Sequence, residues 1–67
     1  MKYRILVTKT LDIPKNIYHQ LLDDEQKAIE VAKKKLIELD GDVAIVAKLV
    51  AGETKVIERF EAVRKAG

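Results

Sequence analysis

The sequence predicts a small α+β domain with the element order ββαββ, in which one helix packs on one face of an antiparallel sheet. Three observations lead to this fold class. Residues 2–9 alternate in polarity, residues 25–39 gather their apolar side chains on one helix face, and an apolar run over 43–50 precedes a glycine-containing turn and a second alternating segment. A single helix with strands before and after it is typical of a sheet that is covered on one side.

Residues 2–9 have the period of two that a half-buried strand requires. One side of this strand presents Tyr3, Ile5 and Val7 to the predicted core, and the other side carries Leu6 among polar residues. The first strand of the sheet is therefore expected here.

Residues 10–16 are typical of a turn, because Pro14 fixes its own backbone and disfavours a helical conformation at the residue before it. Residues 17–22 fit two structures. Their β-branched and aromatic start, Ile17 and Tyr18, favours a strand that returns along the first. The spacing of the apolar residues also fits a helix, which would change the element order to βαββ.

The helix is predicted over residues 25–39, where the apolar residues fall within an arc of about 160° on a helical wheel. Either Asp23 or Asp24 is expected to cap its N-terminus, and Gly41 is expected to take the left-handed position past its C-terminus. The apolar face consists of Ala28, Ile29, Val31, Ala32, Leu36 and Leu39.

Two further strands are predicted over residues 43–50 and 54–63, joined by a turn over 51–53. The first of them is apolar on both sides, which is typical of a strand buried on both faces. Residues 64–67 are expected to fray. The core side of the last strand is assigned to Val56, Phe60 and Ala62.

With 67 residues and no cysteine, the chain is expected to form one domain, residues 1–67, with a thin core and no disulfide. A chain of this size buries only about 60% of the surface that it exposes when unfolded. Additional stability must come from packing, ion pairs or self-association, and self-association is favoured. The expected assembly is a homodimer, or a complex with another protein.

The composition is that of a folded protein, because 48% of the residues are hydrophobic and the net charge is only +2. The N-terminus lacks the apolar run and cleavage site of a signal peptide, and no segment approaches the ~20 apolar residues that cross a bilayer. A cytoplasmic location without a membrane partner is therefore expected. Few side-chain amides and one methionine, with abundant Lys and Glu, match the bias reported for thermophile proteins.

The residue types argue against an enzyme, a cofactor or a small-molecule substrate. Serine and cysteine are absent, so nucleophilic catalysis would need His19 beside a threonine or tyrosine. The acidic residues 23–25 and 40–42 lack the ligand spacing of a calcium loop and are better explained by helix capping and a turn. The three glycines form no phosphate-binding loop. We therefore expect no catalytic, cofactor or metal residue.

Nucleic-acid binding is the alternative function, as a mildly basic accessory protein. Lys27, Lys33 and Lys34 are candidate phosphate contacts on the helix, although acidic residues are interleaved with them. A second set of candidates is predicted to meet on the sheet face away from the helix. It consists of Arg4, Lys48 and Arg59.

The same uncovered sheet face is the basis of the favoured function, which is association with a second copy or with another protein. One helix shelters one side of the sheet, so apolar residues with a charged rim remain on the other side, as in association surfaces. The predicted interface residues are Leu6, Val46, Lys48, Val50, Ile57, Arg59 and Val63.

The element order resembles that of many short proteins encoded by phages and mobile elements. The resemblance consists of a strand, an acid-capped helix containing the run at residues 28–33, and a closing hairpin. Some proteins of this kind inhibit host defence systems, which would imply a host protein as partner. The likeness lies in element order and assigns no site residue.

Overall fold

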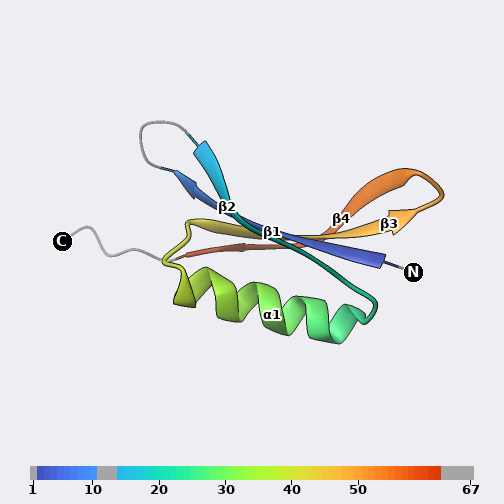
Figure 1. Ribbon diagram of the computed structural model, residues 1–67, viewed down its shortest axis with the longest axis horizontal. Helices are drawn as coiled ribbons and strands as arrows, with labels where there is room; N and C mark the ends of the chain where they lie inside the picture. The colour runs from blue at the N-terminus through green and yellow to red at the C-terminus, as the bar shows by residue number, and fades with distance from the viewer. Residues whose placement is uncertain (1, 11–13, 63–67) are drawn as a thin grey trace.

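The computed structural model describes residues 2–10 and 14–62 and confirms the ββαββ order. Its strands form one antiparallel sheet in the order β2-β1-β3-β4, and the helix lies along one face of that sheet (Figure 1). The elements are β1 (Lys2–Thr10), β2 (Pro14–Leu22), α1 (Glu25–Glu38), β3 (Val43–Val50) and β4 (Glu53–Glu61).

Residues 17–22 belong to strand β2, so the helical alternative for this segment is wrong. β2 pairs with β1 along its whole length, with Tyr18 opposite Val7 and Leu22 opposite Tyr3. The strands also extend into the predicted turn at both ends, because β1 continues to Thr10 and β2 begins at Pro14. A proline is tolerated there, at the first residue of an edge strand.

Helix α1 begins after Asp24, whose side chain accepts a hydrogen bond from the backbone N–H of Lys27 at 3.2 Å. Asp24 is therefore the cap, while Asp23 forms an ion pair with Lys2. At the other end, the left-handed position is occupied by Asp40, with a φ of 54°, and not by Gly41 as expected. The N–H of Gly41 instead donates to the carbonyl of Leu36 at 2.9 Å, which closes the last turn.

The core lies between α1 and the two inner strands. β1 contributes its predicted core side, and α1 contributes the middle of its predicted apolar face, so both predictions are confirmed. Several of these side chains are alanines, which lets the helix approach the sheet closely. The buried cluster consists of Tyr3, Ile5, Val7, Ala28, Ala32, Leu36, Ala44 and Val46.

Each of the two edge strands contains a β-bulge. In β2 the partner of Val7 is Tyr18 and the partner of Thr8 is Asn16, so Ile17 is an extra residue. In β4 an extra residue, Ile57, lies opposite the step from Val46 to Ala47. Both extra isoleucines pack against the core cluster. A bulge reverses the alternation of a strand and increases its twist.

The hairpin between β3 and β4 turns through Ala51 and Gly52, with φ values of 48° and 82°. Two positive φ values in a two-residue loop indicate a type I′ turn. Such turns favour Asn-Gly, because most other residues, alanine included, are strained at positive φ by the contact of Cβ with the backbone.

We expect Ala51→Asn to raise the free energy of unfolding by about 0.5–1 kcal/mol, because asparagine tolerates this backbone conformation better than alanine does. The matched control is Gly52→Ala, which should lower stability by a similar amount for the same reason. A Cβ at Gly52 would meet no atom within 4 Å, so its cost is conformational only. Urea denaturation midpoints measure both changes. Equal midpoints for all three proteins would contradict the assignment of the turn.

Candidate protein-binding face

The side of the sheet away from α1 carries a central apolar band, and we call this side the open face. Its members follow from the strand register, because directly paired residues of antiparallel strands share a face. Within residues 2–10 and 14–62, α1 is the single helix, and it lies on the opposite side of the sheet (Figure 1). The apolar members are Leu21 of β2, Leu6 of β1, Val43, Ile45, Ala47 and Leu49 of β3, and Val56 of β4.

The apolar band runs along β3 and extends onto both neighbouring strands. Leu6 and Ile45 are directly opposite each other at its centre and are partly buried. Leu21 and Val56, on the two edge strands, are 47% and 56% exposed. Ala47 is only 4% exposed although the one described helix lies on the other side of the sheet, so the larger side chains around Ala47 shield it from solvent.

Polar and charged residues surround this band. Two ion pairs lie at opposite corners of the sheet, between Lys2 and Asp23 at 2.6 Å and between Arg59 and Glu61. Both pairs are solvent-exposed, so each contributes little to stability. The remaining polar members of the face are Arg4, Thr8, Thr10, Asn16, His19 and Thr54.

Arg4 is the cation nearest the centre of the open face. It lies between Leu21 of β2 and Ala47 of β3, its direct partners on the two neighbouring strands. Its Nε atom is buried and has no hydrogen-bond partner among the described residues. A buried donor without a partner carries an unfavourable desolvation cost.

The Lys2 ammonium lowers the pKa of Asp23 below its ordinary value, through a hydrogen bond and a Coulombic attraction. A carboxyl whose pKa is lowered in the folded state stabilises that state above its ordinary pKa of 3.8. The contribution disappears as the pH falls through the lowered value. The stabilising contribution of this ion pair is therefore present at neutral pH.

Four of the predicted interface residues do not lie on the open face, and their placement was wrong. Val46 is fully buried beneath α1, and Lys48 and Val50 share its side of β3. Ile57 is the extra residue of the bulge in β4, where the alternation of side chains between the two faces of the sheet is interrupted. Its side chain therefore packs against the core. Val63 lies outside the described residues, as do residues 64–67.

Leu6, Arg59 and Arg4 do lie on the open face, as predicted. The residues that the prediction missed come mainly from the other side of β3, which the prediction does not place at the interface. Both sides of this strand are apolar, so its sequence pattern does not reveal which one faces the helix. Val56 was also assigned to the core side, and the bulge at Ile57 places it opposite Ala47 instead.

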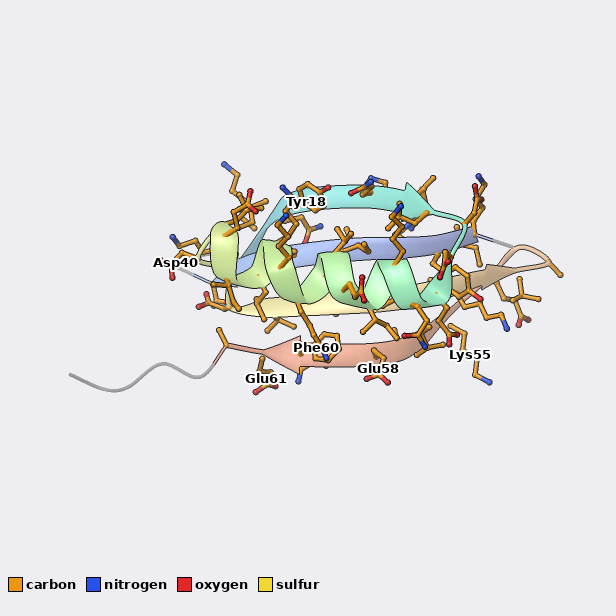
Figure 2. The ribbon with its side chains drawn as sticks, turned by 90° about the horizontal axis from the view of Figure 1, so that it is seen from below. Tyr18, Asp40, Lys55, Glu58, Phe60 and Glu61 are labelled. Carbon is orange, nitrogen blue, oxygen red and sulfur yellow. The ribbon has the colours of Figure 1, made fainter. Side chains whose placement is uncertain are left out.

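The candidate nucleic-acid contacts are dispersed over the molecule. The ammonium of Lys33 lies 5.2 Å from the ring centroid of Phe60, and that of Lys35 lies 5.3 Å from the ring centroid of Tyr18. Figure 2 shows these two aromatic residues on opposite sides of α1. The two lysines therefore make cation–π contacts between the helix and the two outer strands. They point to opposite sides of α1 and do not form a basic stripe.

The remaining basic candidates are divided among three surfaces. Lys27 and Lys34 are exposed on α1, Lys48 lies on the helix side of β3, and Arg4 and Arg59 lie on the open face. Arg59 is already paired with an acidic neighbour. A continuous phosphate-binding track does not arise from this arrangement.

The structure gives each acidic cluster a local role. Asp24 caps α1, Asp40 lies 3.5 Å from the ammonium of Lys9, and the carboxylate of Asp42 accepts a hydrogen bond from the N–H of Thr10. Within residues 2–10 and 14–62, no three His, Cys, Asp or Glu side chains gather as a metal site would require, and no pocket is found. His19 is exposed on β2, opposite Leu6.

In the described part of the chain, α1 is too short and too polar to cross a membrane. Comparisons with protein-family models, with curated proteins and with solved structures give no match to this chain.

Proposed function

We propose that this protein self-associates, as a symmetric dimer in which the open faces of two copies pack against each other. The observation that carries the proposal is the apolar band centred on Leu6 and Ile45, which no other described element of the chain covers. Packing two such faces produces a four-layer arrangement with a helix on each outer side. Sheets that pack face to face in this manner form the interior of β-sandwiches.

The size of the open face is compatible with a weak dimer. Four strands about 4.8 Å apart, each about eight residues long, cover roughly 500 Å² before side-chain relief is counted. Two copies would bury about 1,000 Å², which is near the lower limit for a specific interface. We therefore expect a dissociation constant on the order of micromolar or weaker.

The edges of the sheet are poor sites for association by strand pairing. Both edge strands contain a bulge, and β2 begins at a proline. Figure 2 shows Lys55, Glu58 and Glu61 along β4. Bulges, prolines and charges are the features that protect an edge from pairing with another chain. Association through the face is therefore favoured over association through an edge.

The charges on the open face do not prevent a second copy from binding. Among residues 2–10 and 14–62, the two corner ion pairs leave Arg4 as the unpaired cation of the open face. Mixed signs at the rim with few charges at the centre are typical of protein interfaces. For the part of the chain that the structure describes, the repulsion between two copies is therefore limited to a single pair of cations.

The test is the variant Ile45→Glu, examined by light scattering over a range of concentrations. The new carboxylate would lie directly opposite Arg59, so the monomer is expected to remain folded. It would also place a charge at the centre of the proposed interface, so the dimer should dissociate. The matched control is Ile37→Glu, because Ile37 is 82% exposed on α1 and lies away from the open face.

We expect the wild-type protein and Ile37→Glu to approach the dimer mass as concentration rises, while Ile45→Glu stays monomeric with an unchanged circular dichroism spectrum. A wild-type protein that remains monomeric at millimolar concentration would overturn the proposal. If that monomer instead bound nucleic acid with a steep salt dependence, the alternative function would take its place.

A further inference from the structure

We infer that the two-fold axis of the proposed dimer runs along the strands, midway between β1 and β3. Leu6 then packs on Ile45 of the partner subunit, and Leu21 packs on Val56 of the partner subunit. The inference rests on the proposed function, because it specifies how the two open faces meet. The shape of the sheet and the order of side chains on the open face determine the direction and position of the axis.

The shape of the sheet limits the axis to two directions. Neighbouring strands are rotated by about 20–25°, so a sheet of four strands has the form of a saddle. Figure 1 shows this form, because β1 with β2 and β3 with β4 bend away from α1 at opposite ends of the sheet. Two identical saddles fit over each other when the two-fold axis runs along the strands or across them. An axis along a diagonal brings the raised corners into collision.

The position of the axis follows from the strand order. β1 and β3 are the inner strands, so an axis midway between them places all four strands of one copy over four strands of the other. β1 then lies over β3 of the partner subunit, and β2 lies over β4 of the partner subunit. An axis displaced by one strand would leave an edge strand of each copy uncovered and reduce an area that is already near the lower limit.

The side chains distinguish the two remaining directions. A two-fold axis along the strands leaves the position of each residue along the strand direction unchanged. Leu6 therefore meets Ile45 of the partner subunit, and Leu21 meets Val56 of the partner subunit. Arg4 then lies over Ala47 of the partner subunit, a small side chain that leaves room for the long one. An axis across the strands would place Arg4 over Leu6 of the partner subunit and Arg59 over Val56 of the partner subunit. That arrangement buries two cations against aliphatic side chains in each half of the interface, which is costly.

Site-specific crosslinking tests the direction of the axis, because the natural chain has no cysteine. The variants are Leu21→Cys and Val56→Cys, both at exposed positions of the open face. Packed sheets are about 10 Å apart, so a bis-maleimide with a two-carbon spacer joins cysteines that lie directly across the interface. Light scattering first establishes that each variant still forms the dimer.

We expect crosslinked dimers from an equimolar mixture of the two variants and none from either variant alone. With the axis along the strands, identical residues on the edge strands are three strand spacings apart, about 14 Å, in addition to the gap between the sheets. With the axis across the strands, each cysteine lies over its own strand of the partner subunit, offset by two residues or about 7 Å, whereas the two different cysteines are about 14 Å apart across the sheet. Each variant alone would then crosslink more readily than the mixture. Efficient crosslinking of the single variants, or dimers that do not crosslink in any combination, would overturn the inferred arrangement. Variants and wild type that are all monomeric would instead overturn the proposed function.

Discussion

Val46→Glu is expected to abolish the fold, although Ile45→Glu, one residue earlier in the same strand, is expected to leave it intact. Val46 is 0% exposed and lies opposite Ile5, which is also 0% exposed, beneath α1. A carboxylate buried there without a partner costs several kcal/mol. The total stability of a domain this small is about 3–5 kcal/mol, so the substitution removes most or all of it.

Far-UV circular dichroism and the dispersion of amide signals in NMR spectra measure this difference between the two neighbours. Val46→Ala serves as the control for the loss of volume, because it removes two methyl groups without introducing charge. It should remain folded with reduced stability. If Val46→Glu were folded and monomeric while Ile45→Glu were unfolded, the assignment of the two faces of β3 would be reversed.

The order of elements could be predicted because each element has a clear local pattern. The alternation in β1 matches its burial, and the apolar arc of α1 matches the buried residues Ala28, Ala32 and Leu36. The acidic residues before α1 indicated a cap, and Asp24 provides it. These features depend on a few neighbouring residues, so the sequence contains the information that determines them.

The orientation of β3 could not be predicted because both of its sides are apolar. Lys48 is the only polar residue of this strand, and the prediction places its side of the strand on the open face. In the structure Lys48 lies on the helix side, paired with Tyr3, while Ala44 and Val46 of the same side contact the core. The small side chain of Ala44 suits a surface that the alanines of α1 approach closely. This selection depends on the helix and is not encoded in the strand alone.

The bulge in β4 explains why Val56 and Ile57 were predicted on the wrong faces of the sheet. A strict period of two places Val56 and Phe60 on one side of β4 and Ile57 on the other. The extra residue at Ile57 shifts the pattern, so Phe60 and Ile57 both contact the core and Val56 is exposed. A bulge of one residue depends on pairing between strands, and its position is not visible in a single strand.

The open face therefore contains different residues from those predicted. It is nevertheless apolar at its centre and charged at its rim, as expected. The sequence contains more apolar residues in strands than one helix covers, and this excess was correctly expected to lie on the other side of the sheet. The residues that form its centre, Ile45 and Leu49 among them, became evident only from the register with β1. The association that they support stays a prediction that the Ile45→Glu experiment tests.

Gly41→Ala is expected to lower the free energy of unfolding by about 1–3 kcal/mol, through crowding of the core and not through backbone strain. Gly41 has no positive φ, since Asp40 occupies the left-handed position, so an alanine backbone is tolerated there. Its added Cβ, however, would lie 2.5 Å from Cγ1 of Val7 and 3.3 Å from Cδ1 of Leu36. Both neighbours belong to the buried cluster, so neither moves away without disturbing the packing between α1 and β1.

A double-mutant cycle with Val7→Ala identifies the cause of this loss, because Val7→Ala removes the atom that the new Cβ would meet. Val7→Ala alone is destabilising, since it leaves a cavity in the core. If crowding is the cause, Gly41→Ala should cost much less in the Val7→Ala background than in the wild type, because its methyl group partly fills that cavity. Urea denaturation of the four proteins measures the coupling free energy. An equal cost in both backgrounds would show that the backbone, and not the contact with Val7, requires glycine at this position.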